Sequence, residues 1–210
     1  MLTETRVQDL LRPFELGLTS SQMGQVLTYL ELLLRWNQKI NLTAIRTPEE
    51  CLTRHFGESL YLARWVNLQG KLLDIGSGAG FPGLALKIAF PDLAATLLEP
   101  VAKKRAFLKE VARACQIGSV DVRSERLDDF LREEPGHSFD VVTVRAVGQL
   151  AKLVPAAAHC LKPGGRLCLW LSHEQGRQLK ETQSTICWAP PIAVPLTCQR
   201  EILLGTLATS

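Results

Sequence analysis

A run of glycines directly after a short apolar segment constrains this chain more than any other feature. Residues 72–83 read Leu-Leu-Asp-Ile-Gly-Ser-Gly-Ala-Gly-Phe-Pro-Gly, so a buried strand is expected to lead into a glycine turn and then a helix. Glycines let the backbone turn tightly and let a ligand approach where a Cβ would block it. In an open α/β sheet, the turn after the first strand is a ligand site. The sequence therefore predicts a ligand site at residues 76–81.

The chain beyond Gly70 alternates short apolar runs with longer amphipathic segments. This alternation predicts a mainly parallel sheet with right-handed crossovers and helices on both faces. The last part of the chain is expected to add an antiparallel strand pair, which makes a seven-stranded sheet. The expected strands lie in residues 71–76, 95–100, 119–124, 139–146, 166–171, 192–196 and 201–207.

Residues 1–68 are predicted to form a helical extension that caps the substrate, ahead of a ligand-binding domain at 69–210. One helix is expected over Gln22–Trp36, where apolar residues recur at helical spacing, with Thr19, Ser20 or Ser21 as its cap. A second helix is expected after Pro48, since proline is tolerated in a first helical turn. Its inward face is predicted to include Leu52, Phe56, Leu60 and Trp65.

Composition bounds the kind of protein without identifying a partner. Hydrophobic residues make up 46% of the 210 residues and charged residues 21%, which is enough for a sizeable core. The net charge of +3 is too small to argue for nucleic acid by itself. No apolar run approaches the roughly 20 residues that span a bilayer, and the N-terminus lacks a signal-type stretch. We expect a soluble, cytoplasmic monomer, with no membrane partner.

The six cysteines are scattered, without a C-x-x-C pair or a histidine at ligand spacing. We expect buried free thiols and no metal site.

The spacing of the glycines separates two classes of nucleoside-binding enzyme. The dinucleotide fingerprint G-x-G-x-x-G would need glycine at position 81, where this chain has Phe81. The G-x-G-x-G turn after Asp74 instead resembles motif I of class I S-adenosylmethionine methyltransferases. Glu99 ends the second expected strand, and a carboxylate there can accept hydrogen bonds from both ribose hydroxyls in either class. The sequence thus favours a Rossmann-like class I methyltransferase fold of the α/β class.

Two later segments agree with that resemblance. Leu127-Asp128 follows the third expected strand, where those methyltransferases place an apolar residue and an acid against the adenine edge. Residues 161–165, Leu-Lys-Pro-Gly-Gly, match a turn that is frequent before their fifth strand. Each segment alone is weak, because acids and Pro-Gly-Gly turns are common in loops.

The N-terminal segment resembles one particular family. Residues 35–46, RWNQKINLTAIR, and 54–59, RHFGES, look like the W-N-x-x-x-N-L-T and R-H-x-x-D-S blocks of the RsmG (GidB) family of bacterial small-subunit ribosomal RNA methyltransferases. The form G-S-G-A-G-F-P-G and the pair Arg145-Ala146 also match that family. The resemblance implies S-adenosylmethionine as cofactor, 16S ribosomal RNA or a small-subunit precursor as partner, and methylation of a guanine N7.

Carried over by position, the resemblance implies a set of cofactor contacts. These fall on Gly76, Phe81, Glu99, Pro100, Val101, Leu127, Asp128 and Arg145. The chain departs from the family at Glu58, where the family has aspartate, and at residues 171–173, where Leu-Ser-His replaces a lysine–glycine pair. The tail after Leu203 is also short and uncharged. These departures affect the RNA contacts more than the cofactor.

Methylation of N7 would need no general base. Guanine N7 carries a free lone pair and no proton at neutral pH, so catalysis would come mainly from alignment of the reacting atoms. Arg145 is our candidate catalytic residue, because its guanidinium could hold the cofactor carboxylate or an RNA phosphate. The alternative is a salt bridge. Phe81 or Trp36 could stack on the target base, or could belong to the core.

Four further residues are candidates for substrate contact. Asn37 and Asn41 would either cap the helix and its turn or form the floor of a substrate pocket. His55 is either a structural histidine or a substrate contact. Lys103 begins a basic run that continues to Arg113, and the run is either a solvated helix face or a phosphate-binding one.

Three other functions remain open on the sequence. A methyltransferase of a small molecule or a protein would share the cofactor site. A nicotinamide-dependent oxidoreductase would share the strand–turn–helix unit, although Phe81 argues against it. A nucleoside- or RNA-binding module would keep the site without turnover.

Overall fold

The computed structural model describes residues 2–134, 136 and 138–207, which form an α/β fold around one mixed sheet. In the described residues the sheet has eight strands in the order β3-β2-β1-β4-β5-β8-β6, and β7 also pairs with β8. Strands β1 to β5 are parallel, whereas β8 is antiparallel to β5, β6 and β7. The strands are β1 Lys71–Ile75, β2 Ala94–Leu98, β3 Val120–Arg123, β4 Phe139–Arg145, β5 Leu161–Ser172, β6 Ile186–Trp188, β7 Ile192–Ala193 and β8 Arg200–Leu207.

The predicted Rossmann-like fold is confirmed, with one strand more than expected. Strand β6 was missed, because three residues are too short to display an alternating pattern. Strand β7 is also shorter than the expected 192–196. It ends before Pro195, which has no N–H to donate to a ladder, and Leu196 adopts a positive φ of 62°.

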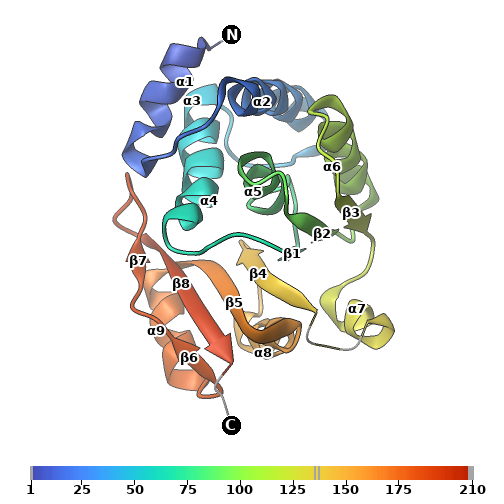
Figure 1. The fold of residues 1–210 in the computed structure, drawn as a ribbon, viewed down its shortest axis with the longest axis vertical. Helices are drawn as coiled ribbons and strands as arrows, with labels where there is room; N and C mark the ends of the chain where they lie inside the picture. The colour runs from blue at the N-terminus through green and yellow to red at the C-terminus, as the bar shows by residue number, and fades with distance from the viewer. Residues whose placement is uncertain (1, 135, 137, 208–210) are drawn as a thin grey trace.

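Helices cover both faces of the sheet, and successive strand residues alternate between the two cores. Leu72 belongs to one core and Leu73 to the other. Helices α5, Gly83–Ala89, and α6, Ala102–Ala114, lie on the face that also carries the N-terminal segment. Helices α7, Leu127–Glu133, α8, Leu150–His159, and α9, His173–Thr182, cover the other (Figure 1).

The N-terminal segment begins with α1, Glu4–Leu11, and a 3₁₀ turn, Arg12–Phe14, before the long helix α2, Ser20–Ile40. Thr19 caps α2 through a capping box with Gln22, which confirms one of the three predicted caps. Apolar residues of α2 are buried in the same core as α5 and α6. The N-terminal segment and the sheet therefore share one hydrophobic core on this face.

The second predicted helix is present but changes its pitch. Helix α3, Pro48–Glu50, continues into a π-helical segment, Cys51–Gly57, then α4, Glu58–Leu60, and a 3₁₀ turn, Tyr61–Arg64. Leu52, Phe56 and Leu60 are buried as predicted. The prediction was wrong for Trp65, which is 53% exposed while Leu62 is buried, because the 3₁₀ turn is tighter than the α-helical spacing assumed.

All six cysteines are free thiols. Four are buried, but Cys187 and Cys198 are exposed, in contrast to the prediction that all are buried. Within the described ranges, no helix combines the length and apolar character needed to cross a membrane.

Candidate functional site

A cleft of about 380 Å³ lies at the carboxyl ends of four neighbouring parallel strands. Strand β1 pairs with β2 on one side and with β4 on the other. The chain adds β2 and β3 on one side of β1 and then reverses, adding β4 and β5 on the other side. A reversal of this kind opens a crevice above the strand ends. The cleft is lined by Ile75, Gly76, Leu98, Pro100, Glu125, Arg126, Leu127, Asp128, Val147, Gly148, Gln149, Lys152 and Leu153.

The glycines of the turn serve different purposes. A Cβ on Gly76 would lie 2.9 Å from Val147 Cγ2, across the cleft end of β4. A Cβ on Gly80 would collide with the hydroxyl of Tyr29, and one on Gly83 would lie 2.7 Å from Asp74 Oδ2. Only Gly78, in this turn, has room for an added Cβ, whose nearest neighbour would lie 3.8 Å away. Packing of the protein against itself therefore requires three of these glycines, whatever the ligand needs.

Asp74 is a structural centre of the turn. Its buried carboxylate accepts hydrogen bonds from the Thr143 hydroxyl at 2.7 Å and from the Gly83 amide at 3.2 Å. Burial raises the pKa of Asp74, and these hydrogen bonds oppose the increase. Asp74 thereby joins β1, β4 and the start of α5.

Glu99 holds the turn from the neighbouring strand. Its carboxylate accepts hydrogen bonds from the Gly78 amide at 2.9 Å and from the Val101 amide at 2.8 Å, and the residue is 4% exposed. Each carboxylate oxygen has two lone pairs, so each keeps capacity for one further donor. Glu99 lies between the cleft-lining residues Leu98 and Pro100 in the sequence.

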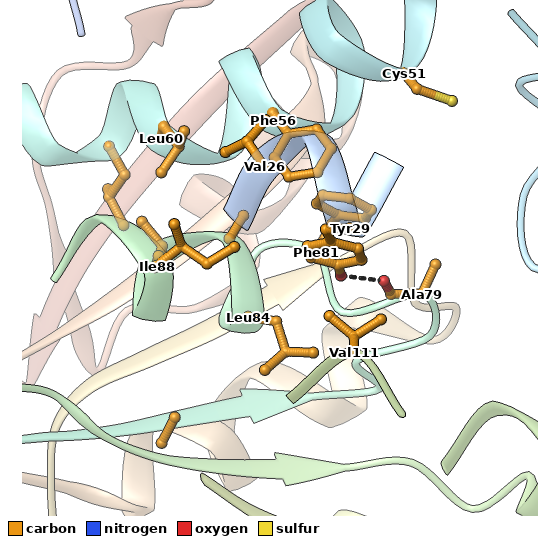
Figure 2. Packing of buried hydrophobic residues seen from close by; sticks show 14 of the residues in the cluster. Val26, Tyr29, Cys51, Phe56, Leu60, Ala79, Phe81, Leu84, Ile88 and Val111 are labelled. Carbon is orange, nitrogen blue, oxygen red and sulfur yellow. Dashed lines mark hydrogen bonds between the residues drawn. The ribbon is translucent and has the colours of Figure 1, made fainter. Parts of the chain in front are cut away.

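Phe81 is buried in an aromatic cluster beneath the turn. Its ring stacks on Tyr29 at 5.1 Å and on His55 at 4.8 Å, and meets the Phe56 ring edge-on at 4.9 Å. Figure 2 shows Tyr29 and Phe81 side by side, and the Tyr29 hydroxyl donates to the Ala79 carbonyl oxygen. Phe81 is not among the residues that line the cleft. The ring is placed to support the turn, in contrast to the stacking on a target base considered above.

Arg145 is directed at the N-terminal segment. Its Nη2 lies 2.8 Å from Glu58 Oε2 and also donates to the Arg54 carbonyl oxygen, while Nη1 donates to Ser59 Oγ at 3.0 Å. Burial lowers the pKa of Arg145 to about 10, against the opposing effect of Glu58. Arg145 does not line the cleft. The guanidinium therefore forms an ion pair between β4 and the segment 54–59, which is the salt-bridge alternative to a ligand contact.

The polar residues of the N-terminal motif organise the chain between α2 and α3. Buried Asn37 accepts from the Thr43 amide at 2.9 Å and donates to the Ile45 carbonyl oxygen at 3.2 Å. Asn41 ends α2 in the left-handed conformation with a φ of 47°. His55 Nε2 lies 2.8 Å from the Thr43 hydroxyl. Asn37 and Asn41 thus have the turn and capping geometry that was one of their two predicted roles.

His55 is neutral at physiological pH. Burial, followed by the positive charges of Arg145, Arg54 and Arg200, lowers its pKa to about 3.

Four of the eight residues predicted to contact the cofactor line the cleft. Gly76, Pro100, Leu127 and Asp128 line it, Glu99 and Val101 adjoin it in the sequence, and Phe81 and Arg145 lie outside the lining. Lys103 is exposed in the first turn of α6, close in sequence to Pro100.

Sequence reasoning missed the loop after β4 and the buried Tyr29. Val147, Gly148 and Gln149 line the cleft, and two nearby non-glycine residues, Ala146 and Gln149, have positive φ values of 55°. A strained backbone of this kind is a signal of function only after the structure is known. Lys152 also lines the cleft and lies 4.0 Å from Asp128.

Solved structures share this architecture at low sequence identity. A crystal structure of a SAM-dependent methyltransferase from Aquifex aeolicus matches with a TM-score of 0.61 and 13% identity, over 76% of this chain and 93% of that one. A ribosomal protein L11 methylase from Lactobacillus delbrueckii matches with a TM-score of 0.60 and 13% identity, over 74% and 79%. The fold is that of the class I S-adenosylmethionine-dependent methyltransferases.

The sequence comparisons narrow the class. The family model described as rRNA small subunit methyltransferase G matches residues 22–197, and this chain belongs to that family. A relative of that name from Syntrophotalea carbinolica is 36% identical over 193 residues, which cover 92% of this chain and 89% of the relative. Another, from Chloroflexus aggregans, is 45% identical over 152 residues, which cover 71% of this chain and 64% of the relative.

The cleft suits S-adenosylmethionine, the cofactor that this class uses. Its volume falls in the usual range for small-molecule sites. Leu98, Pro100 and Leu127 offer apolar surface for a flat adenine, and Gly76 leaves the backbone bare at the end of β1. Glu99 retains acceptor capacity beside them.

Proposed function

We propose that this chain transfers the methyl group of S-adenosylmethionine to N7 of a guanine in 16S ribosomal RNA. Family membership over residues 22–197 is the observation that carries the proposal. The cleft at the reversal between β1 and β4 supports it, because that is where this fold class binds a nucleoside. No specific observation favours a small molecule or a protein as the substrate.

The proposed reaction needs no general base. The described lining holds the carboxylates of Glu125 and Asp128 and the amine of Lys152, but the reaction requires none of them to remove a proton. Guanine N7 attacks through a lone pair that is already free, so no proton has to be removed. The bound cofactor supplies a methyl group activated by its sulfonium. The protein then contributes orientation, which supplies roughly 7–11 kcal/mol at best.

We assign roles in cofactor binding to the residues at the strand ends. Glu99 accepts hydrogen bonds from the ribose hydroxyls with the lone pairs that its two backbone contacts leave free. Leu127 and Pro100 contact the adenine ring, Val101 covers its outer side, and Asp128 accepts from the adenine amino group. Gly76 gives the cofactor access to the backbone.

Residues outside the cleft act through others in this proposal. Phe81 supports the turn through its ring stacking, and Arg145 holds the end of β4 against the segment 54–59. Asn37, Asn41 and His55 fix the shape of the substrate-facing surface of the N-terminal segment, with His55 neutral. Lys103 is the exception, because it contacts an RNA phosphate directly from the first turn of α6.

The proposed partner is 16S ribosomal RNA, either free or in a precursor of the small ribosomal subunit. The names of the relatives, rRNA small subunit methyltransferase G, support this choice. We further propose that the protein acts as a monomer in the cytoplasm, where its substrate is assembled. Size measurement by light scattering checks the monomer.

A transfer assay tests the activity. The purified protein is incubated with cofactor carrying a labelled methyl group and 16S ribosomal RNA that lacks the modification. Mass spectrometry of the digested RNA should then locate one 7-methylguanosine. Parallel incubations contain total metabolites and total protein. Label that enters only a metabolite or a protein would contradict the assignment.

A Glu99→Gln variant provides the matched comparison for that assay. It keeps the size of the side chain, but its NH2 group replaces one of the two oxygens that accept from the Gly78 and Val101 amides. Affinity for the cofactor and methyl transfer should therefore both fall.

A further inference from the structure

Two arginines share one buried carboxylate at the seam between the N-terminal segment and the sheet. Arg200 Nη2 lies 2.6 Å from Glu58 Oε1, and Arg145 Nη2 lies 2.8 Å from Glu58 Oε2. The Glu58 side chain is only 3% exposed. The Trp170 indole N–H donates to the main-chain carbonyl oxygen of Glu58 at 2.8 Å. Residues of the three strands β4, β5 and β8 therefore hold Glu58 in a fixed position.

This seam carries more positive than negative charge. Arg54 is a third guanidinium whose charge acts on the Glu58 carboxyl. His55 adds no charge, because its pKa is lowered to about 3. Asp74 is a second acidic group whose charge acts on Arg145. Three cations thus face at most two carboxylates, which leaves an excess of at least one positive charge. The excess would attract an added anion.

The seam also has hydrogen-bond donors to spare. The Arg200 side chain is 30% exposed, and among the described residues only its Nη2 has a polar partner, Glu58. Its Nε is buried, so Nη1 is the nitrogen left to face a ligand. The side chain of Arg54 is exposed and makes no hydrogen bond or ion pair within the described chain. Arg145, in contrast, has both terminal nitrogens engaged. Arg54 and Arg200 are therefore the two residues that can still receive a ligand.

We propose that Arg54 and Arg200 form an oxyanion site over the Glu58–Arg145 ion pair, and that its occupant is a backbone phosphate of the RNA substrate. The assignment rests on the proposed function. Arginine presents its donors in a planar fork that matches a phosphate. Glu58 and Arg145 are the rigid support that holds Arg200 in place.

The distance of Arg54 and Arg200 from the cofactor cleft favours an RNA phosphate over the cofactor carboxylate as the occupant of this site. Arg200 begins β8 opposite Ser172, at the carboxyl end of β5, and β8 is three strands away from β1. Neither Arg200 nor Arg54 lines the cofactor cleft. The site lies at the same edge of the sheet as the cleft, so a chain whose target base enters the cleft can place a neighbouring phosphate here.

The test measures binding of 16S ribosomal RNA at several salt concentrations, with wild type, Arg54→Gln and Arg200→Gln. Each variant should bind about three- to tenfold more weakly at low salt. The slope of log affinity against log salt concentration should become shallower by about one for each variant, because one phosphate contact is lost. A structural defect alone would not change that slope. Arg6→Gln, on exposed α1, is the charge-matched control and should leave the slope unchanged.

Binding of S-adenosylhomocysteine to the same proteins separates the two sources of an oxyanion. Unchanged affinity for this product supports an RNA phosphate. Reduced product affinity with an unchanged salt slope would overturn the proposal in favour of the cofactor carboxylate. Arg54 is exposed, so Arg54→Gln should fold even if Arg200→Gln does not, and an unchanged slope for it overturns the site. Methyl transfer by the wild type, assayed in parallel, reports on the proposed function separately.

Discussion

The buried hydroxyl of Tyr29 donates a hydrogen bond to the carbonyl oxygen of Ala79, and so joins helix α2 to the glycine turn. On the other side of the turn, Glu99 accepts from the amide of Gly78. The turn is therefore held by a donor from the N-terminal segment and an acceptor from β2. The proposed cofactor site therefore depends on a residue 50 positions before the turn.

Tyr29→Phe should loosen the turn while keeping the aromatic packing. The Ala79 carbonyl oxygen would lose its buried partner, which costs about 1–3 kcal/mol of unfolding free energy. Affinity for S-adenosylhomocysteine, measured by calorimetry, should fall several-fold. Thr28→Val is the control, because it removes a hydroxyl that donates to Gly24 within α2 and does not contact the turn. Equal product affinity in both variants would refute a role for the Tyr29 hydroxyl.

Gly80→Ala should be strongly destabilising, and Tyr29→Phe should relieve part of the loss. Gly80 has a φ of +87°, and an added Cβ would collide with the Tyr29 hydroxyl. The backbone strain and the clash together should cost about 2–4 kcal/mol. Denaturant unfolding of both single variants and the double variant measures the coupling. Simple additivity would show that the clash is not what excludes alanine.

Arg145→Ala should reduce stability as well as activity. The substitution removes one of the two arginine partners of the buried Glu58 carboxylate and leaves Arg200 as the other. The loss should therefore stay below the about 3–5 kcal/mol that a fully unpaired buried charge costs. Chemical denaturation of the variant measures the loss, and Glu58→Gln in the same background should restore part of it. A fully stable, inactive Arg145→Ala protein would instead place Arg145 at the reacting groups.

Acid should destabilise the protein through His55. The folded protein binds a proton at His55 only near pH 3, whereas the unfolded chain binds it near the ordinary value of 6.5. Between these values the unfolded state holds more protons, so stability falls as the pH drops below about 6.5, by up to about 1.4 kcal/mol per pH unit. Above pH 6.5 this group contributes no pH dependence.

The matching measurement compares wild type with His55→Gln. Melting temperatures recorded from pH 4 to pH 8 should converge for the two proteins at the acid end of the series. Parallel curves across the whole range would rule out His55 as the source.

Local patterns in the sequence were sufficient to predict the fold class and most of its strands. Strands β1, β2 and β4 are apolar runs bounded by turn residues, and Thr19 lies next to a periodic helix, so their structure follows from near neighbours. The pitch change that exposes Trp65 depends on how the segment packs, and helical spacing alone cannot reveal it.

The site was only partly predictable, because some of its contacts join residues that are far apart in the sequence. Gly76, Pro100, Leu127 and Asp128 sit at strand ends, and the topology of the fold brings strand ends together. The partners of Arg145 are 86 to 91 positions away in the sequence. Nothing in the composition of either segment encodes such a pairing.

The hydrophobic core shared by α2, α5 and α6 has a consequence for how this chain can be shortened or recombined. A fragment starting at residue 69 would expose the apolar sides of α5 and α6 to water and would release the Ala79 carbonyl oxygen from its anchor. Exchanging the first 68 residues for those of a relative would succeed only if the donor and recipient agree at Tyr29 and Gly80. The residue at position 29 therefore limits which residue position 80 can accept, although the two lie in different parts of the fold.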